Sequence, residues 1–200
     1  MNMKKVLTAT AVLAALAVSA TAQAATPYVE GQLGYANLGD VSSGDISVSF
    51  DSSITYGVEF GFKDVVVPNL RIGTSISTMK FDLNGAQQNG VNATPAQIAA
   101  AGDNFDIRAN LYMVNAYYDF KTSTDFTPFV GFGVGVADIK LDNNNSVNST
   151  EFAYSVNAGA KYNIDKSLYV GAKAAYTRVS PQDVTDVSLY SVNLSVGYEF

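Results

Sequence analysis

The residue types present in the chain already limit the chemistry that its side chains can perform. The 200 residues include no His and no Cys. Without an imidazole the usual general base near neutral pH is missing, and without a thiol there is no disulfide or thiolate metal ligand. Two expected loops are rich in carboxylates, one with Asp40, Asp45 and Asp51 and the other with Asp138, Asp142 and Glu151. These carboxylates could bind divalent cations weakly, but solvated acids are the simpler interpretation of the loops. We therefore expect no catalytic residue, no metal site and no cofactor.

A second set of ionisable residues is spread along the chain but shares one property. Each member falls on the same side of a segment in which apolar and polar residues alternate. The set consists of Glu30, Glu59, Lys63, Arg71, Asp119, Lys161, Lys173 and Glu199. Acids and bases are balanced in this set, so residues that folding brings together could form a network of ion pairs. The elements that carry these residues decide whether they meet.

The clearest of these elements is the C-terminal segment, residues 187–200. Counting back by twos from the final residue gives an apolar or aromatic side chain each time: Phe200, Tyr198, Val196, Leu194, Val192 and Tyr190. The residues between them are small or polar. Because successive side chains of a strand point to opposite faces, the segment predicts a strand with one apolar and one polar face.

Seven further segments alternate in the same way, over roughly the nine to eleven residues of a tilted transmembrane strand. They are residues 27–37, 53–63, 70–79, 111–120, 126–137, 152–164 and 168–177. The links between segments alternate between short ones and longer polar ones. The pattern predicts an all-β fold, an eight-stranded antiparallel up-and-down transmembrane β-barrel with both termini at the periplasmic, short-turn end.

The long link at 80–110 contains a helix signal. Thr94 and Pro95 are typical of a helix start, and Gly102 follows a run of helix-forming residues. We therefore expect a short helix at 94–102.

The segment at 111–120 leaves two alternatives open. Its outward face would hold Tyr112, Val114 and Tyr118, but Leu111 and Met113 continue a competing apolar face from residue 105. Either the lumen is apolar at this point or a β-bulge shifts the register. We favour an apolar lumen, because Asp106, Arg108 and Asn110 would then lie above the bilayer.

Glycine and aromatic residues indicate which face points outward. Apart from Gly31, the glycines of these segments fall on the face opposite the apolar residues. That face must therefore line a narrow lumen and cannot form an apolar ligand-binding pocket. Tyr and Phe gather toward both ends of the apolar face, with aliphatic residues between them. Two aromatic girdles around an aliphatic band are typical of a wall in a bilayer.

The N-terminus has the features of a cleavable signal peptide. Lys4 and Lys5 precede an apolar run at 6–18, and Ala22 and Ala24 form an A-x-A cleavage site. We expect residues 1–24 to be the signal and residues 25–200 the barrel domain, with cleavage after Ala25 as the alternative. With no acid in the signal, its removal makes the net charge of −6 more negative, which argues against a nucleic-acid partner.

The segments 114–120, 127–135, 158–162 and the C-terminal strand resemble the small outer-membrane barrels of the opacity-protein and OmpA-type transmembrane-domain families. The resemblance implies an outer-membrane location, a monomer surrounded by lipid and lipopolysaccharide, and an insertion signal at Tyr198 and Phe200 read by the barrel-assembly machinery. It also implies a non-enzymatic role in envelope integrity or in surface interaction, with a possible ligand at the outer loops. A narrow porin-like channel is the alternative function.

The inward charges allow two interpretations under this fold. Glu30, Glu59, Arg71, Asp119, Lys161, Lys173 and Glu199 would form a network across the lumen, because a charge buried without a partner costs several kcal/mol. The network could fill the barrel as part of its core, or it could act as a gate for ions. A barrel of eight strands has room for side chains rather than for a channel, which favours the structural role.

Overall fold

The structure, a computed structural model, describes residues 25–39, 41–43, 46–88, 91–93, 106–142, 147–180 and 187–200. The expected signal peptide and the expected helix at 94–102 lie outside these residues. No helix within the described ranges is long and apolar enough to cross a membrane.

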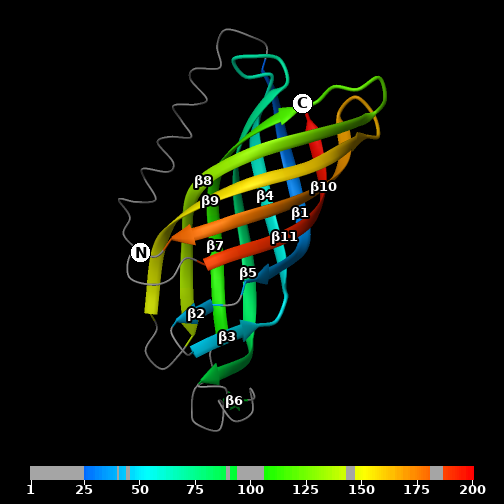
Figure 1. Ribbon diagram of the computed structural model, residues 1–200. Helices are drawn as coiled ribbons and strands as arrows, with labels where there is room; N and C mark the ends of the chain where they lie inside the picture. The colour runs from blue at the N-terminus through cyan, green and yellow to red at the C-terminus, as the bar shows by residue number, and fades with distance from the viewer. Residues whose placement is uncertain are drawn as a thin grey trace.

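Eight long strands close into one antiparallel barrel, which confirms the predicted fold (Figure 1). The strands are β1 (Thr26–Leu38), β4 (Ser53–Lys63), β5 (Leu70–Gln88), β7 (Asp106–Asp119), β8 (Phe126–Asp142), β9 (Val147–Asn163), β10 (Leu168–Ser180) and β11 (Val187–Glu199). Each pairs with the next along the chain, and β11 pairs with β1 to close the wall. The alternating segments therefore become strands at the expected places, with ends that differ by several residues.

The closing pair is continuous along its whole length. The register sets Val29 opposite Tyr198 and Leu33 opposite Leu194. Phe200 follows the last strand residue, and its backbone N–H donates to the carbonyl of Pro27 at 3.0 Å. The barrel therefore has no open edge at this seam, where a free row of backbone groups in lipid would be costly.

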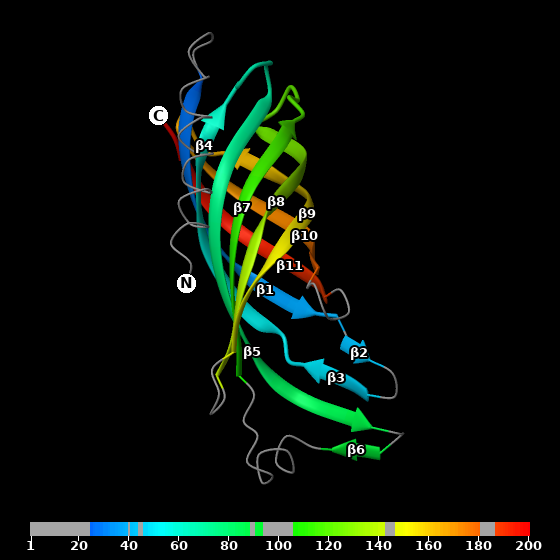
Figure 2. The same cartoon turned by 90° about the vertical axis from the view of Figure 1, so that its left-hand side faces the viewer.

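Three short strands lie where the sequence predicted only loops. They are β2 (Val41–Ser43), β3 (Ile46–Phe50) and β6 (Val91–Ala93), and both β3 and β6 pair with the far end of β5. The loop prediction for 38–52 and 80–110 was wrong at these residues, because Ile46, Val48 and Phe50 also alternate with polar neighbours. Figure 2 shows this extension at the end of the barrel opposite the C-terminus.

The outer wall and the lumen differ sharply in chemistry. Outward residues of the wall are apolar and exposed, among them Leu33, Val58, Phe132, Val156, Val192 and Leu194, while the lumen holds the buried polar residues. This is the distribution of a barrel whose surroundings are lipid.

The short turns at the C-terminal end are held by local hydrogen bonds. In the turn between β4 and β5, Val66 has a φ of 66°, which is unusual for a β-branched residue, and it lies at the centre of a γ-turn closed by a bond from Val67 N–H to the Val65 carbonyl. In the turn between β9 and β10, the Asp165 carboxylate accepts bonds from the N–H groups of Ser167 and Leu168, which lower its pKa.

Candidate functional site

Arg71 lies at the centre of the lumen in the short-turn half. It is the second residue of β5 and is almost completely buried. Its guanidinium lies 3.3 Å from the Asp119 carboxylate, 3.8 Å from that of Glu59 and 3.9 Å from that of Glu30. One planar cation thus contacts acids from three other strands, β1, β4 and β7, so it ties four neighbouring strands of the wall together.

Aromatic rings surround the same guanidinium. Its central carbon lies 4.2 Å from the ring centre of Tyr117, 5.0 Å from that of Phe129 and 5.3 Å from that of Tyr28. The faces of aromatic rings attract cations, and the attraction grows where water is excluded. The rings therefore replace part of the hydration that Arg71 lost on burial.

Glu59 is the most deeply buried acid, with an exposed fraction of 0%. Three donors satisfy its carboxylate: the hydroxyls of Tyr28 and Tyr117, at 2.6 and 2.8 Å, and the amide of Asn115 at 3.1 Å. Lys173 adds a positive charge at 3.8 Å. Burial of a charged carboxylate is tolerable here because both its hydrogen bonds and its charge are matched.

A second group of ion pairs continues from this centre to the short-turn rim. Lys161 lies 2.8 Å from Asp119 and 3.6 Å from Glu199, and Lys63 lies 2.7 Å from Glu199. Lys63 and Glu199 are the more exposed members of the set. The contacts therefore form one connected path from the buried centre to the opening.

Glu30 and Glu199 lie on the paired strands β1 and β11, but they do not share a cation. Glu30 lies opposite Gly197 in the register, and its carboxylate accepts bonds from the Tyr169 hydroxyl at 2.8 Å and the Gln32 amide at 2.9 Å. Arg71 lies beside Glu30, whereas Lys63 and Lys161 lie beside Glu199. Each acid thus has its own set of partners.

All eight inward charges of the sequence analysis meet in this arrangement. The four acids are Glu30, Glu59, Asp119 and Glu199, and the four bases are Lys63, Arg71, Lys161 and Lys173. We call these eight residues the ionic layer. Its formal charge is zero.

The sequence analysis did not identify the aromatic and amide partners in the ionic layer. Tyr28, Tyr117, Phe129 and Tyr169 are buried among the charges. The sequence did contain a signal for these four aromatic residues. Each lies on the lumen side of its strand, opposite the lipid-facing aromatics, and each faces a glycine of a nearby strand. A Cβ on Gly73, Gly131 or Gly197 would collide with Tyr28, Tyr117 or Tyr169 respectively. These glycines give the large rings their space.

A small polar cavity lies next to the ionic layer in the middle of the lumen. Its volume is about 50 Å³, enough for a few water molecules. Its lining is mostly hydroxyl and amide side chains and includes Thr55, Ser75, Asn157, Lys173 and Asn193. The cavity suits water that solvates the remaining N–H groups of Lys173.

An apolar cluster fills the lumen beyond this cavity, toward the long-loop end. It consists of Ala36, Met79, Phe81, Leu111, Met113, Ala137, Ala153, Val179 and Leu189. Strand β7 pairs with both neighbours without a shift in register, so the apolar lumen that we favoured for Leu111 and Met113 is confirmed and the bulge is excluded. We call this cluster the apolar layer.

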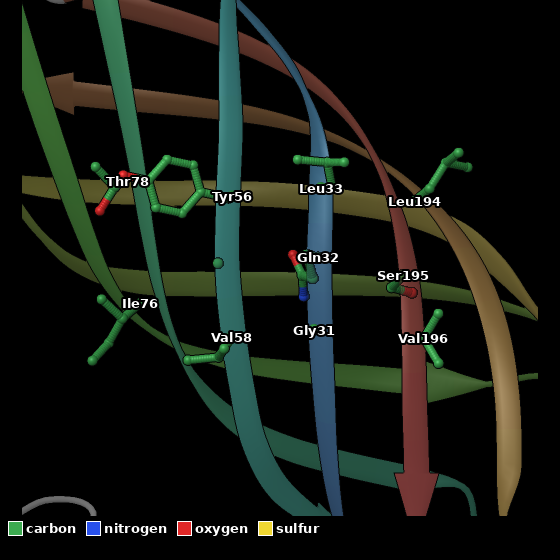
Figure 3. Close-up of a pocket in the computed structure, with 11 residues that line it drawn as sticks. Gly31, Gln32, Leu33, Tyr56, Val58, Ile76, Thr78, Leu194, Ser195 and Val196 are labelled. Carbon is green, nitrogen blue, oxygen red and sulfur yellow. The ribbon is translucent and has the colours of Figure 1, made fainter.

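A large hollow lies on the outer wall, not in the lumen (Figure 3). It has a volume of about 600 Å³, and its lining includes Gly31, Tyr56, Val58, Ile76 and Val196. Gly31 creates it, because a Cβ there would meet nothing closer than the Val196 carbonyl at 4.0 Å. The lining is mostly apolar. Besides the amide of Gln32 and the hydroxyls of Tyr56, Thr78 and Ser195 it holds no ionisable acid or base that could activate them, so this hollow has the chemistry of a lipid contact rather than an active site.

Comparison with known proteins agrees with this architecture. The model of the family described as outer membrane protein beta-barrel domain matches residues 8–200. The outer membrane protein PagN of Salmonella typhimurium is 30% identical over 154 residues, covering 72% of this chain and 61% of PagN. The protein opa of Haemophilus influenzae is 34% identical over 88 residues, covering 42% of this chain and 73% of that protein. The chain thus spans less than two thirds of the length of PagN.

Solved structures show the same fold at low sequence identity. Neisserial surface protein A aligns with a TM-score of 0.65 at 16% identity, covering 89% of this chain and 100% of the other. OprG of Pseudomonas aeruginosa has a TM-score of 0.63 at 12% identity, covering 89% and 97%. Ail, the attachment invasion locus protein of Yersinia pestis, solved in complex with the heparin analogue sucrose octasulfate, has a TM-score of 0.51 at 15% identity, covering 87% and 99%.

Proposed function

This chain belongs to the outer membrane protein beta-barrel family, and from that premise we propose that it is a non-enzymatic adhesin-like protein that acts through its long-loop end. The Gram-negative outer membrane is its location. The observation that carries the proposal is the extension at that end, formed by β2, β3, the end of β5 and β6. It continues the sheet beyond the barrel.

The filled lumen supports a surface role over transport. A solute that entered the barrel would have to pass the apolar layer and then the ionic layer, most of whose side chains are buried. Burying an ion against the apolar layer is costly, and displacing Arg71 would leave Glu59 and Asp119 without their shared partner. We assign the ionic layer a structural role: it holds the short-turn half of the barrel together.

Orientation follows from the lengths of the connections. Short turns face the periplasm in barrels of this kind, and longer loops face the exterior. We therefore place the turns 64–69, 121–125 and 165–167 and both ends of the barrel in the periplasm. The C-terminal strand, with Tyr198 and Phe200, is then presented to the barrel-assembly machinery, and a single copy is sufficient because the wall has no open edge.

The charge of the outer end narrows the ligand class. The links at that end carry Asp40, Asp45, Asp51, Asp183 and Asp186 among their acids. The Ail structure holds a sulfated heparin analogue, but a strongly anionic polysaccharide would be repelled by these carboxylates. A neutral or cationic patch on a host-cell or bacterial surface is the better match.

Adhesion of a non-adherent host bacterium that displays the barrel tests the proposal. Replacing residues 41–50 and 84–93 by short Gly-Ser turns should abolish binding to cultured epithelial cells or to neighbouring bacteria. The shortened barrel should still migrate as a heat-modifiable band, which shows that the wall has folded. As a control, replacing the exposed Lys121 and Lys166 at the short-turn end by Ala should leave adhesion unchanged. Equal adhesion with and without the extension would contradict the proposed function.

A further inference from the structure

Two polar pockets lie at the short-turn opening of the lumen, next to the ionic layer. The first has a volume of about 230 Å³, and its lining includes Lys121 and Lys161. The second has a volume of about 390 Å³, and its lining includes Asp125 and Asp165. We call them the basic pocket and the acidic pocket. Each is larger than a water site and can hold part of a small molecule.

The two pockets adjoin each other and rest on the ionic layer. Lys63 and Asn163 line both of them, so these two residues lie at the border. Lys161, which is only 2% exposed, lines the basic pocket, and Thr127 lies opposite it in the register of β8 and β9. Ion pairs to Asp119 at 2.8 Å and Glu199 at 3.6 Å hold Lys161 in place. A ligand that crosses the border therefore meets side chains that are already fixed.

The basic pocket has an excess of positive charge. Its ionisable lining residues are one acid, Asp119, and three bases, Lys63, Lys121 and Lys161. The two carboxylate oxygens of Asp119 are already engaged, one by Arg71 and the other by Lys161. The exposed Lys121 is thus available to an incoming group, and the pocket attracts an anion.

The acidic pocket has the opposite excess. Its ionisable lining residues are Asp125, Asp165, Glu199, Lys63 and Lys166. Glu199 and Lys63 pair with each other at 2.7 Å, which leaves two aspartates beside one lysine. The backbone bonds that lower the pKa of Asp165 also keep its carboxylate ionised and fixed in direction at neutral pH. This pocket therefore attracts a cation.

Asn69 gives the basic pocket an acceptor without a donor. Its side-chain oxygen is buried and has no hydrogen-bond partner among the described residues. The backbone of Asn69 is held on both sides: its N–H donates to the Asp64 carboxylate at 2.7 Å, and its carbonyl accepts from the Asp119 N–H at 2.9 Å. A buried polar atom without a partner is costly. An N–H group of a ligand in the basic pocket would satisfy it.

We propose that the short-turn opening binds a short peptide with free termini. The carboxylate of the peptide lies in the basic pocket beside Lys121, its last amide N–H donates to the Asn69 oxygen, and its ammonium group lies in the acidic pocket beside Asp125. An extended tripeptide spans about 10 Å, which suits two adjoining pockets of these sizes. A simple anion would use neither the acidic pocket nor the Asn69 oxygen. The proposed orientation places this site in the periplasm, and the site is independent of adhesion, which involves the opposite end of the barrel.

An NMR titration of the isotope-labelled barrel in micelles with tri-alanine tests the site. Wild type should show saturable shifts of the backbone amides in the turns 121–125 and 165–167. Acetylation of the peptide's amino group, or amidation of its carboxylate, should each weaken binding about threefold, because each removes one ion pair at an exposed site. Equal binding of the three peptides, or no saturable shift with tri-alanine, would overturn the proposal.

Matched variants assign each end of the peptide to its pocket. Lys121→Ala should weaken the binding of tri-alanine about threefold but should not weaken the amidated peptide further. Asp125→Asn should weaken tri-alanine to a similar extent without affecting the acetylated peptide. As a control, Lys166→Ala removes the same charge as Lys121→Ala from the acidic pocket and should not weaken binding. Equal losses from Lys121→Ala and Lys166→Ala would show a general charge effect and contradict the two-pocket assignment.

The amide contact and the source of the peptide have their own tests. Asn69→Gly keeps a residue that tolerates the φ of 70° and removes the acceptor. It should weaken tri-alanine but not a tri-alanine methylated at its last amide nitrogen, and an equal effect on both would contradict the contact. Binding of either tri-L-alanine or tri-D-alanine supports the site, and the tighter one identifies the source, because cell-wall peptides contain D-residues and protein fragments do not. Heat-modifiable migration of every variant confirms folding before binding is compared.

Discussion

At the scale of single residues, Arg71 is the side chain on which the ionic layer most depends. Replacement by Ala leaves Glu59 and Asp119 buried without the cation between them. Removing one partner of a buried ion pair costs about 3–5 kcal/mol, so we expect a large shift of the urea midpoint of the refolded barrel in micelles. Lys121→Ala, at an exposed site, should not shift it. A midpoint unchanged by Arg71→Ala would mean that the charges do not hold the wall together.

Two glycines provide a matched test of lumen packing. A Cβ on Gly131 would collide with the Tyr117 ring, whereas Gly31 faces open space on the outer wall. Gly131→Val should cost about 1–3 kcal/mol through overpacking, and Gly31→Val should stay within about 0.5 kcal/mol of wild type. The unfolding midpoints of the two variants check this. Similar effects of the two substitutions would show that the rings do not need the glycines.

At the scale of elements, the facing of β11 can be tested by a charge. Leu194 is 66% exposed on the outer wall, in the middle of the aliphatic band. Leu194→Arg should cost roughly 2–4 kcal/mol near the bilayer midplane, measured by refolding titrations into lipid vesicles, with Leu194→Ile as a nearly neutral control. A neutral Leu194→Arg would indicate that this face does not contact lipid.

Alternation along the chain was sufficient to predict all eight wall strands, because each has one face in lipid and, outside the apolar layer, the other in a polar lumen. The extension was missed because Ile46, Val48 and Phe50 stand in a Ser- and Asp-rich link that resembles a loop. Tyr28, Tyr117 and Tyr169 were missed because aromatics were assigned to the lipid girdles. Their role in binding Glu59 and Glu30 depends on which strands become neighbours across the lumen, and periodicity within a strand does not contain that information.

At the scale of the whole molecule, the apolar layer and the ionic layer both block the lumen, so we predict that the barrel does not conduct ions. Purified wild-type protein in planar bilayers should give no stable conductance steps. Leu111→Ser/Met113→Ser, which makes the apolar layer polar, should also remain silent, because the ionic layer still blocks the lumen. Regular, voltage-independent steps from wild type would instead support the porin-like alternative.

The seam between β1 and β11 has a consequence for the time course of assembly. The strand that is made first in the barrel pairs with the next strand early, but it finds its second partner only when the strand that is made last arrives. Contacts between such distant parts of a chain form slowly, so the wall cannot be completed during synthesis. Until the seam closes, β1 and β11 each keep one row of backbone N–H and C=O groups without a partner. The barrel is therefore open to edge-to-edge association with other chains in the interval before this seam closes.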